Sequence, residues 1–338
     1  MPEIYGVSPQ FSARSGLTNQ EYFVHGLFAL AYAANASISL PTLRWAGSLG
    51  APHAVHVPHE ALFDVAPWRA AVARGELPPF TDAPPTRSFG EGSLWRAVTE
   101  RQTALIRSGA LRRPSLDEAF ARFALEPSAR IRKAVRAVQP PRPFACLHAR
   151  VELDAAASRT HIDAGYVRFG RLATILRGRG PPAGATSLFV AVARRNVAEA
   201  DAALLTPGAS PVWPDVPLRV GGVDAALGQG FNDDSAYVAG GVIDKRVCLS
   251  ADVFIGCNWS TFSNSIVYGR LVRGAGSSFV YSPRGVRRRR DDGRLDGVLL
   301  RQEWPRPEES ARVVENNIFA VERLKRIPRW LARPARSA

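Results

Sequence analysis

Three short apolar runs in the second half of the chain alternate with helical patterns. The apolar runs cover residues 144–147, 188–193 and 253–256. The helical patterns cover residues 164–176, 197–205 and 262–271, and a weaker strand pattern covers 218–220. Runs this short and this apolar are typical of strands buried on both faces, and their alternation with helices predicts a parallel sheet with crossover helices. We therefore expect an α/β fold that binds its ligand beyond the carboxyl ends of these strands.

The first half of the chain opens in the same manner. Apolar residues at helical spacing predict a helix over about 19–34, and residues 38–41 read as a short strand that a proline ends. Two further helices are expected at 94–109 and 116–138, whereas the rest of the region 50–139 matches no clear pattern.

A proline-rich segment at 139–143 separates the two halves and is typical of an interdomain linker. The chain has 338 residues, which is enough for two lobes of ~150 residues each. We expect Rossmann-like lobes with parallel sheets at 1–140 and 141–310. Residues 311–338 would form a C-terminal helix and a basic tail, because apolar residues recur at helical spacing over 308–331.

The formal net charge of +14 would by itself suggest a polyanionic partner such as nucleic acid or a membrane surface. However, the only lysines are Lys133, Lys245 and Lys325, and this arginine bias, with abundant alanine, proline and glycine, is typical of GC-rich coding sequence. Nucleic-acid-binding modules interleave aromatic and basic residues, and no such module is visible, so no nucleic-acid partner is expected. The basic run 284–290 is either a surface loop or a contact for acidic acceptors or membrane.

The cysteines, Cys146, Cys248 and Cys257, form no CxxC pair, and a zinc site would need more ligands nearby. Their odd number leaves at least one free thiol and does not fix the redox compartment. No Asp-x-Asp motif lies near a strand end, so we expect neither a metal ion nor a cofactor. No run reaches the ~20 apolar residues of a membrane span, and no signal peptide is visible, so no membrane anchor is expected in this chain.

The strongest local signal lies after the first of the apolar runs, where four ionisable residues follow at alternate positions: His148, Arg150, Glu152 and Asp154. Alternate residues of an extended chain face the same way, so these side chains would share one face at a strand's carboxyl end. Such a cluster suits a pocket, although a salt-bridged strand edge would show the same pattern. The planar fork of Arg150 can bond two diphosphate oxygens, and His148 could donate to the same group. Glu152 and Asp154 could act as a base or orient the arginine.

A second segment carries groups suited to an anion. The apolar strand that ends at Gly256 is followed by Ser260, Thr261 and Ser263, where the next helix is expected to begin. Hydroxyls and free backbone N–H groups at a helix start can bind an anion, although plain capping of the helix would use the same residues. Asp252, just before the strand, could accept hydrogen bonds from a base.

A third segment, 15–20, forms a tight polar turn before the first predicted helix. A glycine turn followed by amides, here Gly16 and Asn19, can approach the backbone or the sugar of a ligand. The segment is short and alone identifies no ligand.

These three segments occur in the same order in a known family, and the chain resembles the protein O-fucosyltransferase-like glycosyltransferases. The segment 16–20, with its helix and then Leu40-Pro41, is similar to the family's first motif. The segment 148–154 is similar to the HxRxExD motif of the plant branch of O-fucosyl- and rhamnosyltransferases.

The third motif of the family is a strand of pattern D-x-F-h-G followed by a helix start of pattern S-[ST]-F. Residues 252–256, 260–263 and Arg270 are similar to it. The three motifs frame residues 15–270 but match closely over only about 50 positions. The sequence departs from the plant branch after 148–154, where 155–158 reads Ala-Ala-Ala-Ser instead of a bulky apolar segment.

The resemblance implies a GT-B fold, in which the N-terminal lobe faces the acceptor and the C-terminal lobe holds most of the donor. It implies a GDP-sugar, usually GDP-fucose, and transfer with inversion to a hydroxyl of a protein or glycan without a metal ion. The family usually works in the lumen of the endoplasmic reticulum or Golgi, which is the only indication of a compartment.

Carried over position by position, the resemblance implies that Arg150 and His148 grip the β-phosphate. Glu152, beside Arg150, is the hypothetical base for the acceptor hydroxyl. The other donor contacts that the resemblance implies are Gly16 and Asn19 near the sugar or diphosphate, Asp252 at guanine, and Ser260, Thr261 and Phe262 at phosphate and nucleoside.

Two alternatives stay open from the sequence. The chain could use another nucleotide sugar, since no residue that would select fucose can be identified. It could also be a non-catalytic nucleotide- or nucleic-acid-binding protein on the same fold.

Overall fold

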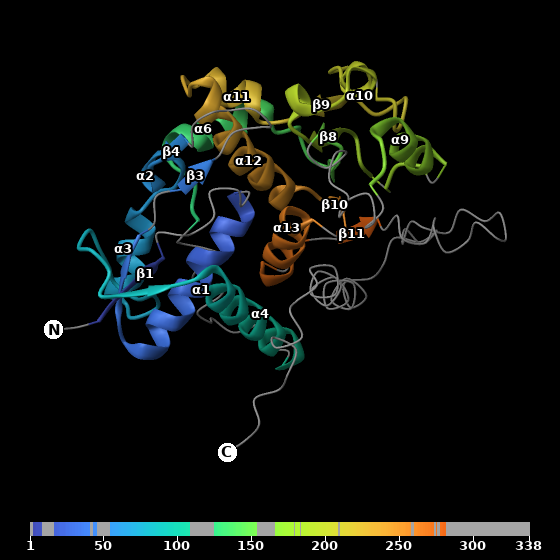
Figure 1. Cartoon of the computed structure of the whole chain (residues 1–338). Helices are drawn as coiled ribbons and strands as arrows, with labels where there is room; N and C mark the ends of the chain where they lie inside the picture. The colour runs from blue at the N-terminus through green and yellow to red at the C-terminus, as the bar shows by residue number, and fades with distance from the viewer. Residues whose placement is uncertain are drawn as a thin grey trace.

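The second half of the chain forms a five-stranded parallel sheet in the order β11-β10-β7-β8-β9 (Figure 1). Its strands are β7 (Ala145–His148), β8 (Leu188–Ala191), β9 (Leu218–Val220), β10 (Val253–Cys257) and β11 (Ser278–Tyr281). The chain starts at the central strand β7, adds β8 and β9 on one side, and then returns to add β10 and β11 on the other. Strand order therefore reverses between β7 and β10, which is the position where doubly wound sheets bind ligands at their carboxyl edge.

The computed structural model describes most of the chain up to residue 281. The described residues are 3–8, 17–40, 43–45, 55–108, 125–153, 166–178, 180–182, 184–208, 210–257, 260–273, 275 and 278–281. The predicted helix at 308–331, the basic run 284–290, Gly16 and Asp154 lie outside these residues.

Helices cover both faces of the second sheet, and alternate strand residues belong to two separate hydrophobic clusters (Figure 1). Cys146 and Phe254 face the cluster formed with α6, α12 and α13, whereas Leu147 and Ile255 face the cluster formed with α9. In the described residues of this half, the helices and the 3-10 turn are α6 (Ala129–Val138), α9 (Phe169–Arg177), η3 (Arg194–Asn196), α10 (Glu199–Leu204), α11 (Val223–Leu227), α12 (Asp233–Ser250) and α13 (Thr261–Val272). The prediction of buried parallel strands with crossover helices is confirmed.

The first half of the chain forms a second parallel sheet in the order β5-β2-β1-β6. Its elements are β1 (Ile4–Val7), α1 (Leu17–Ala34), β2 (Ser37–Ser39), α2 (His59–Leu62), α3 (Ala66–Ala73), β5 (Phe80–Thr81), β6 (Arg87–Phe89) and α4 (Glu91–Ser108), with an antiparallel pair formed by β3 (Leu43–Trp45) and β4 (Val55–Val57). Helices α1 and α4 pack closely because Gly26 has no side chain: a Cβ there would lie 2.2 Å from the carbonyl oxygen of Leu94. The sequence did not indicate strands β1, β5 and β6, which are two to four residues long.

The two sheets lie on either side of residue 140, but the hydrophobic core is not divided at that point. Residues of β4, α2 and α6, such as Val57, Leu62 and Ile131, belong to the same cluster as α12 of the second half. The lobe boundaries at 140 and 310 stay a prediction, because 310 lies outside the described residues.

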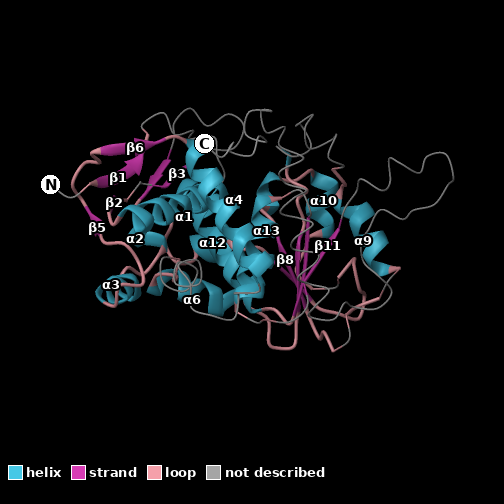
Figure 2. Cartoon of the chain, turned by 90° about the horizontal axis from the view of Figure 1, so that it is seen from below, coloured by secondary structure: helices cyan, strands magenta, loops and turns pink. Residues whose placement is uncertain are grey.

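The beginning of α1 meets the second half of the chain, as both views show (Figures 1 and 2). Glu21 on α1 and Lys245 on α12 form an ion pair with 2.5 Å between Oε2 and Nζ; Glu21 is buried, and the Lys245 side chain keeps 12% of its surface exposed. Burial lowers the pKa of Lys245, and the carboxylate of Glu21 opposes that shift. A buried pair of this kind fixes the first turn of α1 beside α12 and α13, because separating the two charges would leave each without its partner. No helix in the described part of the chain is long and apolar enough to cross a membrane.

Candidate functional site at the carboxyl edge of the second sheet

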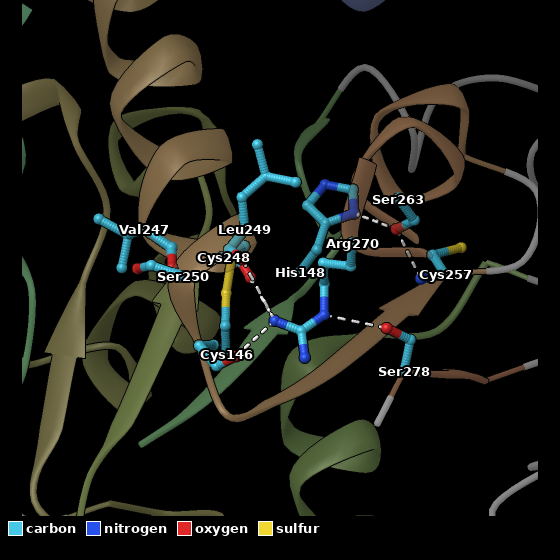
Figure 3. The surroundings of a disulfide bond; sticks show 11 residues. Cys146, His148, Val247, Cys248, Leu249, Ser250, Cys257, Ser263, Arg270 and Ser278 are labelled. Atoms are coloured by element: carbon cyan, nitrogen blue, oxygen red, sulfur yellow. Dashed lines mark hydrogen bonds between the residues drawn. A yellow bond between two sulfur atoms is a disulfide. The ribbon is translucent and has the colours of Figure 1, made fainter. Parts of the chain in front are cut away.

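His148 is the last residue of the central strand β7 and lies at the point where strand order reverses. Leu147 pairs with Ile255 in the register of β7 and β10, so His148 stands beside Gly256. The Nδ1 atom of His148 lies 2.7 Å from the Oγ of Ser263 in the first turn of α13 (Figure 3). The two apolar runs identified in the sequence therefore end at one shared polar site.

The start of α13 lies against the end of β10 because Gly256 leaves room for it. A Cβ at this position would lie 2.8 Å from both Cβ and Oγ of Ser263, so a larger residue would push the helix away. Ser263 accepts a hydrogen bond of 2.8 Å from the backbone N–H of Cys257. The glycine and the serine together place the positive end of α13 at the carboxyl edge of the sheet, where it favours an anion.

The first turn of α13 carries the other predicted phosphate contacts. Ser260 is buried just before the helix, Thr261 is half-buried, and the ring of Phe262 packs on His148 with 4.7 Å between ring centroids. Ser260, Thr261 and Phe262 therefore lie at the start of the helix that contacts His148 through Phe262 and Ser263.

His148 is held in its neutral form. Burial lowers its pKa to about 3, and the positive charge of Arg150 adds to that effect. A neutral imidazole carries one donor and one acceptor nitrogen. With Nδ1 bonded to Ser263, the Nε2 atom on the other side of the ring has no hydrogen-bond partner among the described residues.

Arg150 and Glu152 follow β7 as a salt-bridged pair. The Nη1 of Arg150 lies 2.7 Å from Oε2 of Glu152, and Glu152 is buried while the Arg150 side chain keeps 20% of its surface exposed. The predicted alternation of these residues on one face is therefore present. The carboxylate orients the guanidinium, which is one of the two roles expected of Glu152.

Tyr281, at the end of β11, fixes the backbone of this segment from two strands away, because β10 lies between β11 and β7. Its hydroxyl donates to the carbonyl of His148 and accepts from the N–H of Arg150, each at 3.2 Å. Burial raises the pKa of Tyr281 well above its ordinary value, so the hydroxyl stays protonated and can make both bonds. This contact could not be predicted from the sequence, because 131 residues separate Tyr281 from Arg150.

A further buried carboxyl group lies on α12 near this pair. Asp244 accepts a hydrogen bond from the backbone N–H of Gly222 in the turn after β9, and its Oδ1 has no partner among the described residues. Burial raises its pKa well above the ordinary value, and the charge of Glu152 acts in the same direction. The hydrogen bond from Gly222 connects α12 to the turn after β9.

Asn19 lies in the part of α1 that meets the second half of the chain. It lies in the first turn of α1, two residues before Glu21, which is paired with α12. Its Oδ1 is buried and has no hydrogen-bond partner within the described ranges. An unsatisfied buried amide oxygen is costly in water-free surroundings and suits a hydroxyl donor of a ligand.

Asp252 does not lie with these residues, and its predicted place at the donor is not supported by the structure. It precedes β10 and therefore lies at the amino edge of the sheet, where the parallel strands begin. His148 lies at the carboxyl edge, where the strands end. Its carboxylate bonds the guanidinium of Arg142 and accepts from the N–H of Phe144 at 2.9 Å. Burial alone would raise the pKa of Asp252, but these bonds hold it below the ordinary value.

Arg270, the last residue of the third motif, also forms its hydrogen bonds at the amino edge. Its fully buried guanidinium donates to carbonyl oxygens at the end of α12, among them Cys248 at 3.2 Å, and to Oγ of Ser278 at 3.0 Å (Figure 3). It also bonds the carbonyl of Ala251. Burial lowers its pKa to about 10. Cations at the end of a helix are stabilised by the helix dipole, so Arg270 fixes the connection from α12 to β10.

The cysteines lie between the two edges. Cys146 on β7 and Cys248 on α12 form a disulfide, and the buried Cys257 takes part in no disulfide, as the odd number of cysteines requires for at least one thiol (Figure 3). Among the described residues, no group of three or more His, Cys, Asp or Glu side chains could hold a metal ion.

Two solved structures of POFUT1 align with most of the chain. The complex with GDP-fucose in crystal form I aligns with a TM-score of 0.50 and 13% identity, over 82% of this chain and 97% of that chain. The complex with GDP in crystal form III aligns with a TM-score of 0.50 and 14% identity, over 83% and 99% of the two chains. The chain matches no protein-family model and none of the curated protein sequences.

Identity this low shows the fold alone. The mixed α/β architecture with parallel sheets matches the GT-B fold of these structures, so the predicted fold class is confirmed. The likeness supports a fucosyltransferase-like fold and does not single out the plant branch.

Proposed function

We propose that the chain is a glycosyltransferase that transfers fucose from GDP-fucose, with inversion, to a hydroxyl of a protein or glycan. The observation that carries this proposal is the site between β7 and β10, where a guanidinium, a neutral imidazole and a helix start converge at the reversal of strand order. The POFUT1 structures with the same fold are complexes with GDP-fucose and GDP, which supports a nucleotide-sugar donor.

The residues at this edge fit a diphosphate. Diphosphate oxygens only accept hydrogen bonds, and the guanidinium of Arg150 and the first N–H groups of α13 are donors. The Nε2 atom of His148 is a further donor if the neutral ring carries its proton there. When the bond to the sugar breaks, negative charge grows on the β-phosphate, and fixed donors in a buried site stabilise that charge. We therefore propose that Arg150 and His148 stabilise the leaving GDP and that the reaction needs no metal ion.

We propose that Asn19 contacts the sugar rather than the diphosphate. Its unpartnered atom is Oδ1, an acceptor, and an acceptor suits a sugar hydroxyl but not a phosphate oxygen. This contact would bring α1 of the first half to a donor held by the second half. Gly16, which precedes it, is proposed to shape the same approach on the evidence of the sequence resemblance alone.

Glu152 has two candidate roles, and the salt bridge favours one of them. A carboxylate bonded to Arg150 at 2.7 Å orients the arginine, whereas a base must reach the acceptor hydroxyl. The variant Glu152→Gln separates these roles. An orienting role predicts about a ten-fold loss of kcat/KM, because the amide still contacts Arg150, while a base predicts a loss of about 100-fold or more in kcat.

The test of the proposed function compares nucleotides by thermal unfolding and donors by sugar release. We expect GDP and GDP-fucose to stabilise the protein selectively, by about 2.7 kcal/mol at a concentration 100 times the Kd. We also expect fucose release from GDP-fucose to continue in the presence of EDTA. Selectivity for another nucleotide sugar would support the alternative donor, and binding without any release or transfer would support a non-catalytic nucleotide-binding protein. If no nucleotide changes the stability, the proposal is wrong.

A further inference from the structure

Ser263 makes two hydrogen bonds that connect three elements of the site. Its Oγ lies 2.8 Å from the backbone nitrogen of Cys257 at the end of β10 and 2.7 Å from Nδ1 of His148 at the end of β7 (Figure 3). Ser263 has no exposed surface, and the ring of Phe262 covers one side of His148. The hydroxyl is therefore shielded from water and is held in place from two sides.

The direction of the second hydrogen bond follows from counting protons. A serine hydroxyl has one proton to donate and two lone pairs. The N–H of Cys257 can only donate, so it occupies one lone pair of Oγ. The buried hydroxyl proton needs an acceptor, and Nδ1 of the neutral His148 is the acceptor that lies within reach among the described residues.

If Nδ1 accepts, the remaining proton of the neutral ring must be on Nε2. Nε2 then becomes a donor that faces away from Ser263 and has no partner among the described residues. A donor in that position matches a phosphate oxygen. The opposite tautomer would present a lone pair, which a phosphate oxygen repels.

We propose that Ser263 is a positioning residue that fixes His148 as the neutral Nε2–H tautomer and aims that N–H at the donor's diphosphate. The diphosphate part of this inference rests on the proposed function, whereas the tautomer does not. The close contact at Gly256 supports the role of Ser263, since the missing side chain there is what lets Oγ reach both partners. Neither the family motif nor the alternation of residues in the sequence indicated this function for Ser263.

The variant Ser263→Ala tests the connection to nucleotide binding. We expect it to weaken GDP affinity about ten-fold, because the imidazole loses the group that sets its tautomer and its orientation. The matched control is Ser265→Ala, since Ser265 is also buried on α13 but donates to the carbonyl of Phe262 in its own helix. It should leave GDP affinity within about two-fold of the wild type.

A second variant keeps this test specific to His148. His148→Gln retains a donor near the position of Nε2 but has no nitrogen in the place of Nδ1. If Ser263 acts through His148, Ser263→Ala should have no further effect on GDP affinity in the His148→Gln background. Equal effects of Ser263→Ala in both backgrounds would show a role independent of His148 and would overturn the positioning role.

The decisive measurement is two-bond proton–nitrogen NMR of the nucleotide-free protein labelled with 15N-histidine, with His148→Gln assigning the resonance. A protonated Nε2 and an unprotonated Nδ1 on His148 at neutral pH are expected, with a mixture of tautomers in Ser263→Ala. A protonated Nδ1 in the wild type would overturn this inference and leave the proposed function standing. Conversely, if GDP does not bind, the proposed function is wrong. The tautomer of His148 would still be determined by the same NMR spectrum.

Discussion

The second sheet has ionisable residues at both its amino edge and its carboxyl edge, and the two edges differ in how far these residues are hydrogen-bonded within the protein. At the amino edge, Asp252 is bonded to Arg142 and Phe144, and Arg270 is surrounded by carbonyl oxygens. At the carboxyl edge, His148 is kept neutral, and its Nε2 has no partner in the described part of the chain. Arg150 at the carboxyl edge is also paired, with Glu152, but its side chain keeps 20% of its surface exposed. The charges of the amino edge are satisfied within the fold, whereas an imidazole nitrogen without an internal partner at a strand-order reversal is available to a ligand.

The largest effect is expected when the buried guanidinium of the amino edge is removed. Arg270→Leu leaves several buried carbonyl oxygens at the end of α12 without a donor, so we expect a loss of about 4 kcal/mol in the free energy of unfolding. Urea denaturation measures it. Arg142→Ala, at the same edge but with 63% of its side chain exposed, should cost no more than about 1 kcal/mol. Equal costs would show that burial of the guanidinium is not what matters.

The next largest effect is expected on catalytic activity, which an arginine of the carboxyl edge should support and an arginine of the amino edge should not. Arg150→Ala removes a donor from the growing charge on the leaving diphosphate, so kcat/KM for GDP-fucose should fall about 100- to 1,000-fold. Arg142→Ala removes an arginine from the other edge and should retain activity within about two-fold. Steady-state transfer assays of both variants make the comparison. A similar loss in both would contradict the assignment of one edge to the ligand.

The pH dependence of stability distinguishes the two edges in a third way. The folded-state pKa of His148 is lowered to about 3, so the unfolded chain binds its proton first and stability is lost as the pH falls below about 6.5. Asp252 also has a lowered pKa, but its contribution to the stability of the fold is lost only as the pH falls below about 4.

From the lowered pKa of His148, we expect the free energy of unfolding of the wild type to fall by about 2 kcal/mol between pH 7 and pH 5. In His148→Gln this contribution is absent, so the fall over the same pH range should be about 2 kcal/mol smaller. Asp252→Asn should change the slope only below about pH 4. Urea denaturation across this pH range is the measurement. Unchanged slopes between pH 7 and 5 in His148→Gln would show that the imidazole is not held neutral by the fold.

The smallest effect concerns the hydroxyl that holds the carboxyl-edge segment in place. Tyr281→Phe removes bonds to the carbonyl of His148 and to the N–H of Arg150, so we expect a loss of about 1 kcal/mol in stability and a few-fold loss in GDP affinity. Isothermal titration calorimetry measures the affinity. Tyr5→Phe, a buried tyrosine of the first sheet, should leave GDP affinity unchanged. A loss of GDP affinity in both variants would show a general effect on folding and would contradict the role of Tyr281 at the site.

The sequence predicted the elements with strong periodicity and the cluster at the end of β7. Alternation of His148, Arg150 and Glu152 after an apolar run showed which end of that strand is polar. For Asp252 the sequence did not show the edge of the sheet, because proximity to a strand in sequence does not show at which end of the strand the residue meets a ligand. Its position before β10 places it at the amino edge.

Contacts between distant parts of the chain could not be predicted. Ser263 is 115 residues from His148, and Tyr281 is 133 residues from it, so both partners become visible only when the strand order is known. Short strands such as β1 were also missed, since four residues give too little alternation to separate a strand from a loop.

The most direct test of the central claim is a crystal structure of the chain with GDP. We expect the β-phosphate to lie at the carboxyl edge between β7 and β10, within hydrogen-bond distance of Arg150, of Nε2 of His148 and of the backbone at the start of α13. GDP bound at the amino edge near Arg142 and Asp252, or away from the second sheet, would contradict it.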